Sequence, residues 1–310
     1  MIITVTLNTA LDHTLFVHEL TLNTTVRAYH SMISVAGKAT DVSWVLSELG
    51  EENLAMGFAA GRFGQQMELM LQQKGVATDF VWVGGETRLN TVIVSDDHRP
   101  QTTVTTDTLE VSSEHLDQLR SRFTGGLSRA SVVVISGSLP HNIRPSFYAE
   151  LIQLANRQGV PVILDASGLA LREGLEARPA VIKPNLDELS YLAGQVLPSM
   201  AEVRAAAEDV HACYGAAVVA TLAENGALAV LPGKTYQIPP LPVKVASPAG
   251  AGDAVVAGLA AALARHEPLE FGLRLGFAAA GAVVMMAGTA DCHRQDIDTL
   301  FPIVELILLP

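Results

Sequence analysis

The chain has 310 residues, which is enough for one large α/β domain, and 49% of them are hydrophobic. Its formal net charge of −12 argues against nucleic acid or an anionic membrane as a partner. The two cysteines, Cys213 and Cys292, lie far apart without CxxC spacing, so we expect reduced thiols in a cytoplasmic protein rather than a disulfide framework.

Strand and helix patterns alternate along most of the chain. The first strand is expected at residues 2–7, with no basic region or cleavage signal before it, and helical spacing of apolar residues follows at 42–49 and 67–71. Further strands are predicted at residues 132–136, 160–165, 181–183, 217–221 and 228–231, and helices at 147–158 and 201–214. Buried strands joined by helices indicate a mainly parallel sheet wound on both faces.

Two segments lack this helical alternation. Residues 14–35 and 87–106 are rich in Thr, Val and Ile, and the second contains the turn cluster DDHRP at residues 96–100, which predicts a hairpin. We expect both segments to form a small antiparallel sheet that serves as a lid or pairs two subunits. The apolar run at 275–286 is too short to span a bilayer and predicts a buried helix, and residues 303–310 should pack on the body.

The most informative motif is GAGD at residues 250–253, followed by a helical run of small residues. Two glycines permit a tight turn, and the free N–H groups of the next helix can then bind an anion. Asp253 adds a carboxylate that can accept a proton, as phosphoryl transfer to a hydroxyl requires. Asp is also common in a first helical turn, so the motif alone leaves a structural role open.

Polar residues follow several predicted strands. They are Asn8 and Asp12 after the first strand, and the segments 136–140, 165–168, 183–188 and 221–226 after later ones. In a doubly wound sheet, ligands bind beyond the carboxyl ends of the strands, so these segments predict one shared site.

These segments resemble the PfkB carbohydrate kinases, within the ribokinase-like fold, and in particular their hexose-phosphate branch of 1-phosphofructokinases and tagatose-6-phosphate kinases. The resemblance rests on NTALD at 8–12, VAGKATDV at 35–42, TRLN at 87–90, SGSLP at 136–140, KPN at 183–185 with Glu188, and GAGD at 250–253. It implies one ribokinase-like domain over residues 1–310, with lid strands from about 14–35 and 87–106. It also implies ATP as phosphoryl donor, Mg²⁺, a sugar phosphate as acceptor and a homodimer formed through the lid.

The resemblance also implies residue roles. Asp253 would be the catalytic base, beside an anion hole formed by Gly250, Ala251 and Gly252. The acceptor would be held by Asp12, Gly37, Lys38, Asp41, Arg88, Asn90 and Ser138, with Arg27 as a weaker candidate. The nucleotide would contact Lys183, Asn185, Thr221, Ala223, Gly226 and Gly252, and Mg²⁺ would be positioned by Asn185 and Glu188.

Several of these residues have a simpler structural alternative. Asp12 could cap a turn, Arg88 could be a solvated hairpin charge, and Lys38 could be an exposed loop lysine. Glu188 could be an ordinary carboxylate in a first helical turn. The nine histidines show no paired spacing such as HxxxH, so a zinc site is not expected.

The chain departs from the branch's pattern at several positions, among them Thr9, which replaces a proline and should matter little. Ala39 and Asp41 stand where Gly and Asn are usual, and the alanine adds a methyl group where a positive φ or a close approach is expected. Ala223 replaces a usual glycine, Pro248 a usual threonine, and Met286 a polar residue of a cation-binding loop. These departures keep two alternatives open, namely a kinase for a non-phosphorylated sugar or polyol and a catalytically weakened sugar or nucleotide sensor. A nicotinamide dehydrogenase is disfavoured, because no GxGxxG follows the first strand.

Overall fold

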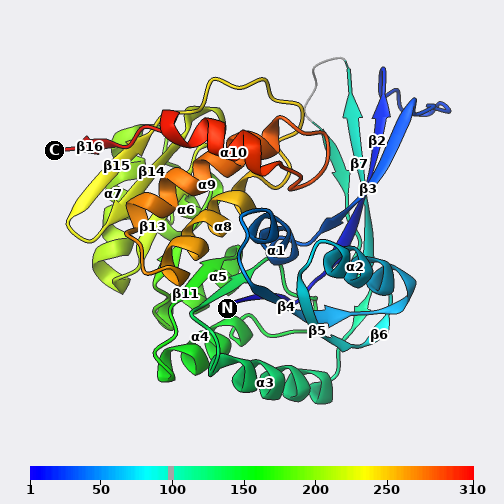
Figure 1. The fold of residues 1–310 in the computed structure, drawn as a ribbon, viewed down its shortest axis with the longest axis horizontal. Coiled ribbons are helices and arrows are strands. Elements are labelled where there is room, and N and C mark those ends of the chain that lie inside the picture. Colours follow the sequence, from blue (N-terminus) through cyan, green and yellow to red (C-terminus); the bar gives the residue numbers. More distant parts are fainter. Residues whose placement is uncertain (97–100) are drawn as a thin grey trace.

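A ten-stranded sheet forms the centre of the computed structural model, which describes residues 1–96 and 101–310 (Figure 1). Its strand order is β16-β15-β14-β13-β12-β11-β10-β1-β4-β5. Seven strands run parallel: β1 (Ile2–Thr6), β4 (Asn53–Ala59), β5 (Ala77–Trp82), β10 (Val132–Ser136), β11 (Val162–Asp165), β12 (Val181–Ile182) and β13 (Ala217–Thr221). At one edge β14 (Ala227–Leu231), β15 (Lys234–Ile238) and β16 (Ile307–Leu309) pair antiparallel.

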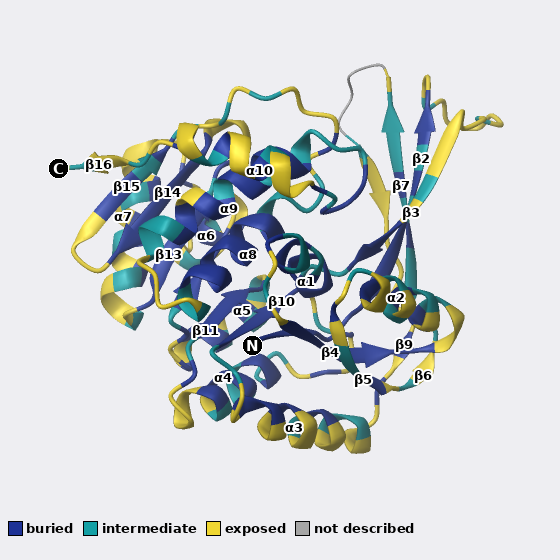
Figure 2. Cartoon of the chain, viewed as in Figure 1, coloured by how far each residue is buried: buried dark blue, intermediate teal, exposed yellow. Residues whose placement is uncertain are grey.

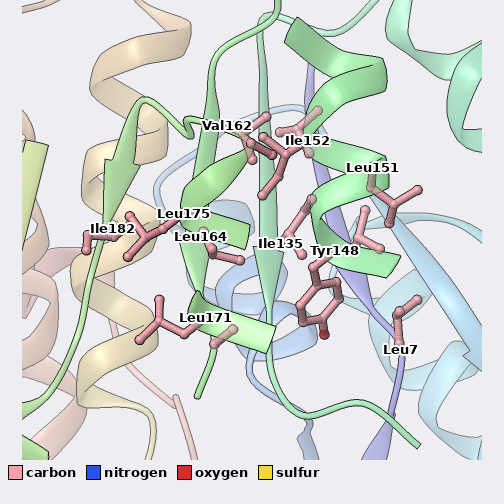
Figure 3. Packing of buried hydrophobic residues seen from close by; sticks show 14 of the residues in the cluster. Leu7, Ile135, Tyr148, Leu151, Ile152, Val162, Leu164, Leu171, Leu175 and Ile182 are labelled. Carbon is pink, nitrogen blue, oxygen red and sulfur yellow. The ribbon is translucent and has the colours of Figure 1, made fainter. Parts of the chain in front are cut away.

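Helices cover both faces of this sheet; α3 is exposed on its outer side, whereas most of α8 is buried (Figure 2). One face carries α3 (Ser113–Leu127), α4 (Phe147–Arg157), α5 (Gly168–Glu176), α6 (Leu186–Ala193) and α7 (Met200–Tyr214). The other carries α1 (Ala39–Glu48), α8 (Ala251–Ala264), α9 (Leu269–Val284) and α10 (Arg294–Leu300). Ile135, Tyr148 and Leu164 pack together on the first face (Figure 3). The doubly wound fold predicted from the sequence is therefore present.

Most of the predicted strands and helices lie within a few residues of observed ones, whereas β4, β5, α3, α5, α6 and α10 were not predicted. The apolar run at 275–286 overlaps α9, which is largely buried, and the last apolar segment adds β16 to the sheet edge. Short elements complete the chain: β6 (Gly84–Gly85), β9 (Leu109–Glu110) and the 3-10 turns at Ala223–Asn225 and Phe301–Ile303. Within the described residues, no helix has the length and apolar character needed to cross a membrane.

A second sheet of four strands stands beside the main body, next to α1 and α2 (Gly61–Gln73) (Figure 1). We call it the lid; its order is β3 (His30–Ala36), β2 (Ala10–Val17), β7 (Arg88–Ser95) and β8 (Thr102–Val104). The predicted small sheet and the β7–β8 hairpin are present, although residues 97–100 of the turn cluster lie outside the described residues. The central β2–β7 pairing is parallel, so the lid is a mixed sheet rather than a purely antiparallel one.

The close packing of α8 against α9 depends on glycines at their crossing. A Cβ atom on Gly258 would lie 2.2 Å from the backbone nitrogen of Gly276 and 2.8 Å from the backbone oxygen of Gly272. Because these obstacles are backbone atoms, no side-chain rotation relieves the clash. The three glycines therefore set the position of α8, the helix that begins at the glycine turn.

We predict that Gly258→Ala destabilises the protein by about 1–3 kcal/mol, because the methyl group forces the two helices apart. Urea unfolding followed by circular dichroism measures the change. Gly125→Ala in α3 is the matched control: a Cβ there meets no atom within 4 Å, so better helix propensity should raise stability by up to about 1 kcal/mol. Equal stability of the two variants would contradict the packing argument.

Candidate active site

The predicted glycine turn leads directly into α8. Gly250 has a φ of +85°, and a Cβ atom there would lie 2.4 Å from the backbone nitrogen of Ala290, so both conformation and space require glycine. The helix begins at Ala251, and no side chain at its N-cap hydrogen bonds to it. The N–H of Ala251 donates to the Pro248 carbonyl at 3.3 Å, and the N–H groups of Gly252 and Asp253 that follow it can bind an anion. Asp253 lies in this first turn and is 8% exposed.

A buried lysine lies over the start of the same helix. A Cβ atom on Gly252 would be 3.3 Å from Lys183 Nζ, so the ammonium group lies against the helix N-terminus. Lys183 is only 5% exposed and follows β12, which pairs with β11 in the main sheet. The ammonium group of Lys183 and the N–H groups at the start of α8 lie at the same place, which therefore favours a negatively charged ligand.

Asp165, at the end of β11, joins Lys183 to a second lysine. Its Oδ1 lies 3.0 Å from Lys38 Nζ and its Oδ2 3.4 Å from Lys183 Nζ. Burial alone would raise the pKa of Asp165, but the charges of Lys183 and Lys38 hold it below the ordinary value. The surrounding carboxylates Asp165, Asp253 and Glu188 in turn raise the pKa of Lys38 against the effect of its burial. Asp165 is one of the polar residues at the predicted strand ends, and no role was predicted for it.

Lys38 adopts an unusual backbone conformation at the start of α1, with φ 39° and ψ −76°, after Gly37 with φ 107°. Of the two reasons given for glycine at position 39, a positive φ or a close approach, the positive φ does not apply, because Ala39 is the first helical residue of α1 and is buried there. The positive values fall one and two residues earlier. A non-glycine residue in this region carries strain of about 1–3 kcal/mol, which the ion pair with Asp165 helps to offset.

Asp41 and Asp12 are two further carboxylates near Asp253. Burial, followed by the negative charge of Asp165, raises the pKa of Asp253 to about 7. Burial also raises the pKa of Asp41 well above its ordinary value, with contributions from Asp253 and Asp12. A carboxylate with a pKa close to neutrality is well matched to accepting a proton from an alcohol.

Asp12 connects the lid to the main body. Its Oδ1 accepts a hydrogen bond of 2.8 Å from Asn90 Nδ2 on β7, and its Oδ2 accepts one of 2.8 Å from Thr289 Oγ1 in the loop after α9. All three residues are buried. Thr289 was not predicted as a site residue, although nearby Met286 was compared with the cation-binding loop of relatives.

Arg88 is directed at backbone oxygens in this structure. Its Nη2 donates to the carbonyl of Asn8 at 2.5 Å, and its Nε donates to the carbonyl of Thr9 at 3.5 Å. Burial lowers the pKa of Arg88, against the opposing charges of Asp107 and Asp12. Asn8 Nδ2 also donates to Ser138 Oγ at 3.3 Å, so Arg88 and Ser138 both contact the segment after β1.

Asn185 and Glu188 cap the start of α6 reciprocally. Asn185 Oδ1 accepts from the Glu188 N–H at 2.8 Å, and Glu188 Oε2 accepts from the Asn185 N–H at 2.9 Å. The remaining oxygen, Oε1 of Glu188, lies 3.9 Å from Lys38 Nζ and so faces the lysine cluster. The structure therefore shows the first-turn role of Glu188 and leaves one oxygen directed toward the site.

The loop after β13 lies next to this cap. Thr221 ends β13 and forms a bridge with Asn185. Ala223 has a φ of 51°, which explains why glycine is favoured at this position. Gly226 serves packing, since a Cβ there would lie 2.1 Å from the backbone oxygen of Ile238.

At the carboxyl end of the sheet, a helix start suited to anions lies beside two lysines and a carboxylate whose pKa is close to neutrality. This combination defines a phosphotransferase site. Residues 5–296 match the model of the pfkB family carbohydrate kinases, and the chain belongs to this family of ATP-dependent kinases. It is 31% identical over 310 residues to tagatose-6-phosphate kinase of Staphylococcus epidermidis, covering 99% of each chain.

Solved structures agree with this assignment. Phosphofructokinase-2 from Escherichia coli in complex with substrates and products superposes with a TM-score of 0.92 at 29% identity, covering 98% of this chain and 99% of the other. Arabidopsis thaliana ribokinase, with ribose and ATP, gives a TM-score of 0.76 at 20% identity, with 97% and 98% covered. At that identity the ribokinase supports the fold alone, and the predicted ribokinase-like fold is confirmed.

The raised pKa of Asp253 predicts that kcat/KM falls as the pH drops below about 7, because a protonated carboxyl cannot accept a proton. In Asp165→Asn a negative charge that raises this pKa is lost while Lys38 and Lys183 stay positive. The acidic limb of the pH profile should then move to lower pH, alongside a general loss of activity. Asp187→Asn, at an exposed position in the first turn of α6, is the control. An acidic limb that stays in place in Asp165→Asn would contradict the electrostatic coupling.

Proposed function

We propose that this protein transfers a phosphoryl group from ATP to a hydroxyl of a sugar phosphate of the tagatose-6-phosphate, fructose-6-phosphate or fructose-1-phosphate type. The observation that carries this proposal is the near-neutral carboxylate of Asp253 in the first turn of an uncapped helix. The names of its relatives, a tagatose-6-phosphate kinase and a phosphofructokinase, support the acceptor class.

In this proposal Asp253 accepts the proton of the attacking hydroxyl as the oxygen bonds to the γ-phosphorus of ATP, while the bond from that phosphorus to the oxygen bridging it to ADP breaks and ADP leaves. The N–H groups of Gly252 and Asp253 and the ammonium of Lys183 stabilise the charge that builds on the transferring group, and the N–H of Ala251 can join them once it leaves the Pro248 carbonyl. Because this environment is held in place before the substrate arrives, little reorganisation accompanies the reaction. Asp165 acts indirectly by holding both lysines.

The residues expected to position Mg²⁺ suit a water-mediated role. Asn185 Oδ1 and Glu188 Oε2 already accept backbone hydrogen bonds, while Glu188 Oε1 faces the lysine cluster. Mg²⁺ commonly keeps several of its waters, which these oxygens can hold. When bound with the nucleotide, the ion supplies neutralisation of phosphate charge. Thr221, Ala223 and Gly226 lie in the neighbouring loop, where the nucleotide is expected.

A non-phosphorylated sugar or polyol is the second candidate acceptor, and Asp41 favours it. A third carboxylate beside Asp12 and Asp253 repels an acceptor phosphate but accepts hydrogen bonds from hydroxyls. The cations proposed for the acceptor phosphate, Arg88 and Lys38, are already engaged with protein oxygens. Arg27 is exposed in the segment between β2 and β3.

A screen of sugars and sugar phosphates with ATP and Mg²⁺ tests the function. We expect steady turnover with one ketohexose phosphate, reduced about 10²–10⁴-fold in kcat by Asp253→Asn because the general base is lost. Asp187→Asn, also in a first helical turn, should retain wild-type activity. Turnover restricted to free sugars or polyols would select the second acceptor class. Binding of sugar or nucleotide without turnover would select a sensor, and full activity of Asp253→Asn would refute the role of Asp253.

The outer face of the lid suits the expected homodimer. Alternation along the strands places Leu15, Ile33, Ile93 and Val104 on the face opposite Asp12, and Ile33 and Val104 are 40% and 56% exposed. An apolar sheet face without helix cover favours association. Phosphofructokinase-2 from Escherichia coli has been solved in a tetrameric inhibited form, which shows that a relative self-associates.

The free thiols Cys213 and Cys292 and the use of ATP support a cytoplasmic location.

Ile33→Asp should convert the dimer into a monomer, because it places a charge in the apolar interface. Analytical ultracentrifugation measures the change in mass. Leu69→Asp on α2, where the leucine is 55% exposed outside the lid, is the matched control and should remain dimeric. A wild-type monomer, or a dimer that survives Ile33→Asp, would contradict the lid interface.

A further inference from the structure

Several buried polar atoms around the site have no hydrogen-bond partner within the described residues. They are Asn8 Oδ1, Ser34 Oγ, Asp41 Oδ1, Asn90 Oδ1 and Ser136 Oγ. A buried polar atom without a partner is costly, and clustering of such atoms at one site indicates groups that a ligand satisfies. Asn8, Asp41, Asn90 and Ser136 belong to the motifs that carry the family resemblance, whereas Ser34 belongs to none of them and has no proposed role.

Ser34 lies in a polar row across the lid. In the strand register, Asp12 on β2 pairs with Ser34 on β3 and with Asn90 on β7, so the three side chains share one face. That face is directed at the main body, because Asp12 hydrogen bonds to Thr289. Met32, two residues from Ser34 and on the same face, agrees: a Cβ on Gly288 would lie 2.8 Å from its Cε.

The hydrogen-bonding capacity of the row defines what it can bind. Asn90 uses Nδ2 on Asp12, which leaves Oδ1 as an acceptor, and each Asp12 oxygen accepts one internal hydrogen bond. The hydroxyl of Ser34, which is 9% exposed, can both donate and accept. The row contains a carboxylate and no cation, so it repels a phosphate and suits hydroxyl groups.

We propose that Ser34 is a specificity-determining residue that hydrogen bonds to a hydroxyl of the acceptor sugar and distinguishes the configuration of the carbon bearing it. This inference rests on the proposed function and deepens it by orienting the acceptor. The carbons that carry hydroxyls lie against Ser34, Asp12 and Asn90, and the end that carries the phosphate lies away from them. A hydroxyl on the wrong side of its carbon leaves Ser34 unpaired, which penalises that epimer.

The test compares acceptors that differ at one carbon. Wild type, Ser34→Ala and Ser31→Ala are assayed with fructose-6-phosphate and with its C3 and C4 epimers. Ser34→Ala should lower kcat/KM for the preferred acceptor about 3- to 10-fold, mainly through KM, as expected for one lost neutral hydrogen bond. The preference over at least one epimer should narrow, while the KM for ATP should stay unchanged. Ser31 lies on the same strand, exposed and on the opposite face, so Ser31→Ala should behave as wild type.

Unchanged kinetics in Ser34→Ala would overturn the proposal. Equal losses for every epimer, or a raised KM for ATP, would also overturn it, because they indicate a purely structural role. If wild type phosphorylates only free sugars, the proposed acceptor class is wrong. The role of Ser34 is then tested in the same way, by comparing free sugars that are epimers of each other. If there is no turnover at all, the proposed function fails, and calorimetric titration with the same sugars decides whether Ser34→Ala narrows the preference in binding.

Discussion

The ion pairs of Asp165 with Lys38 and Lys183 are the interaction on which the site depends. A charge as deeply buried as Asp165 is tolerated only when it is paired, and two lysines this close would repel each other without it. The three residues come from the ends of β11 and β12 and from the turn before α1. Their mutual attraction therefore fixes three chain segments at one point and holds an ammonium group over the start of α8. It also accounts for the strained backbone of Lys38, which the fold alone would not favour.

A second set of contacts makes the lid part of the catalytic unit. Asp12 joins β7 of the lid, through Asn90, to Thr289 of the loop after α9. The next residue, Ala290, hydrogen bonds to Ala249 and packs against Gly250, which makes the turn into α8. A few contacts therefore connect the lid directly to the segment that carries the N–H groups of the helix start and Asp253. In the proposed function, a sugar bound under the lid would lie against this same chain of contacts.

Local patterns in the sequence predicted the parallel sheet, the lid and the glycine turn, because each is determined by periodicity or by glycine chemistry over a few residues. Asp165, Thr289 and Ser34 were not assigned, since their neighbours are set by strand register or by loop contacts between segments that are distant in the chain. The parallel β2–β7 pairing was missed for a related reason, because alternation along a strand is the same in both directions of pairing. A positive φ was one of the two possibilities at position 39 because the motif does not distinguish adjacent positions of the turn, whereas sterics assign it to Gly37 and Lys38.

Three carboxylates lie together in the site, namely Asp12, Asp41 and Asp253. For Asp253 among them, the protonated state favours the stability of the fold, whereas the ionised state favours activity. Because the pKa of Asp253 is raised to about 7, the folded protein retains a proton that the unfolded chain loses near pH 4, so this group's contribution to stability declines as the pH rises between those values. Catalysis needs the ionised form and therefore the less stable protein. Asp41 shares this opposition, because burial and the negative charge of Asp253 raise the pKa of Asp41 as well. In the proposed function, acceptor hydroxyls that donate hydrogen bonds to Asp41 would favour its ionised form, so the aspartate at position 41 would couple recognition of hydroxyls to its own charge.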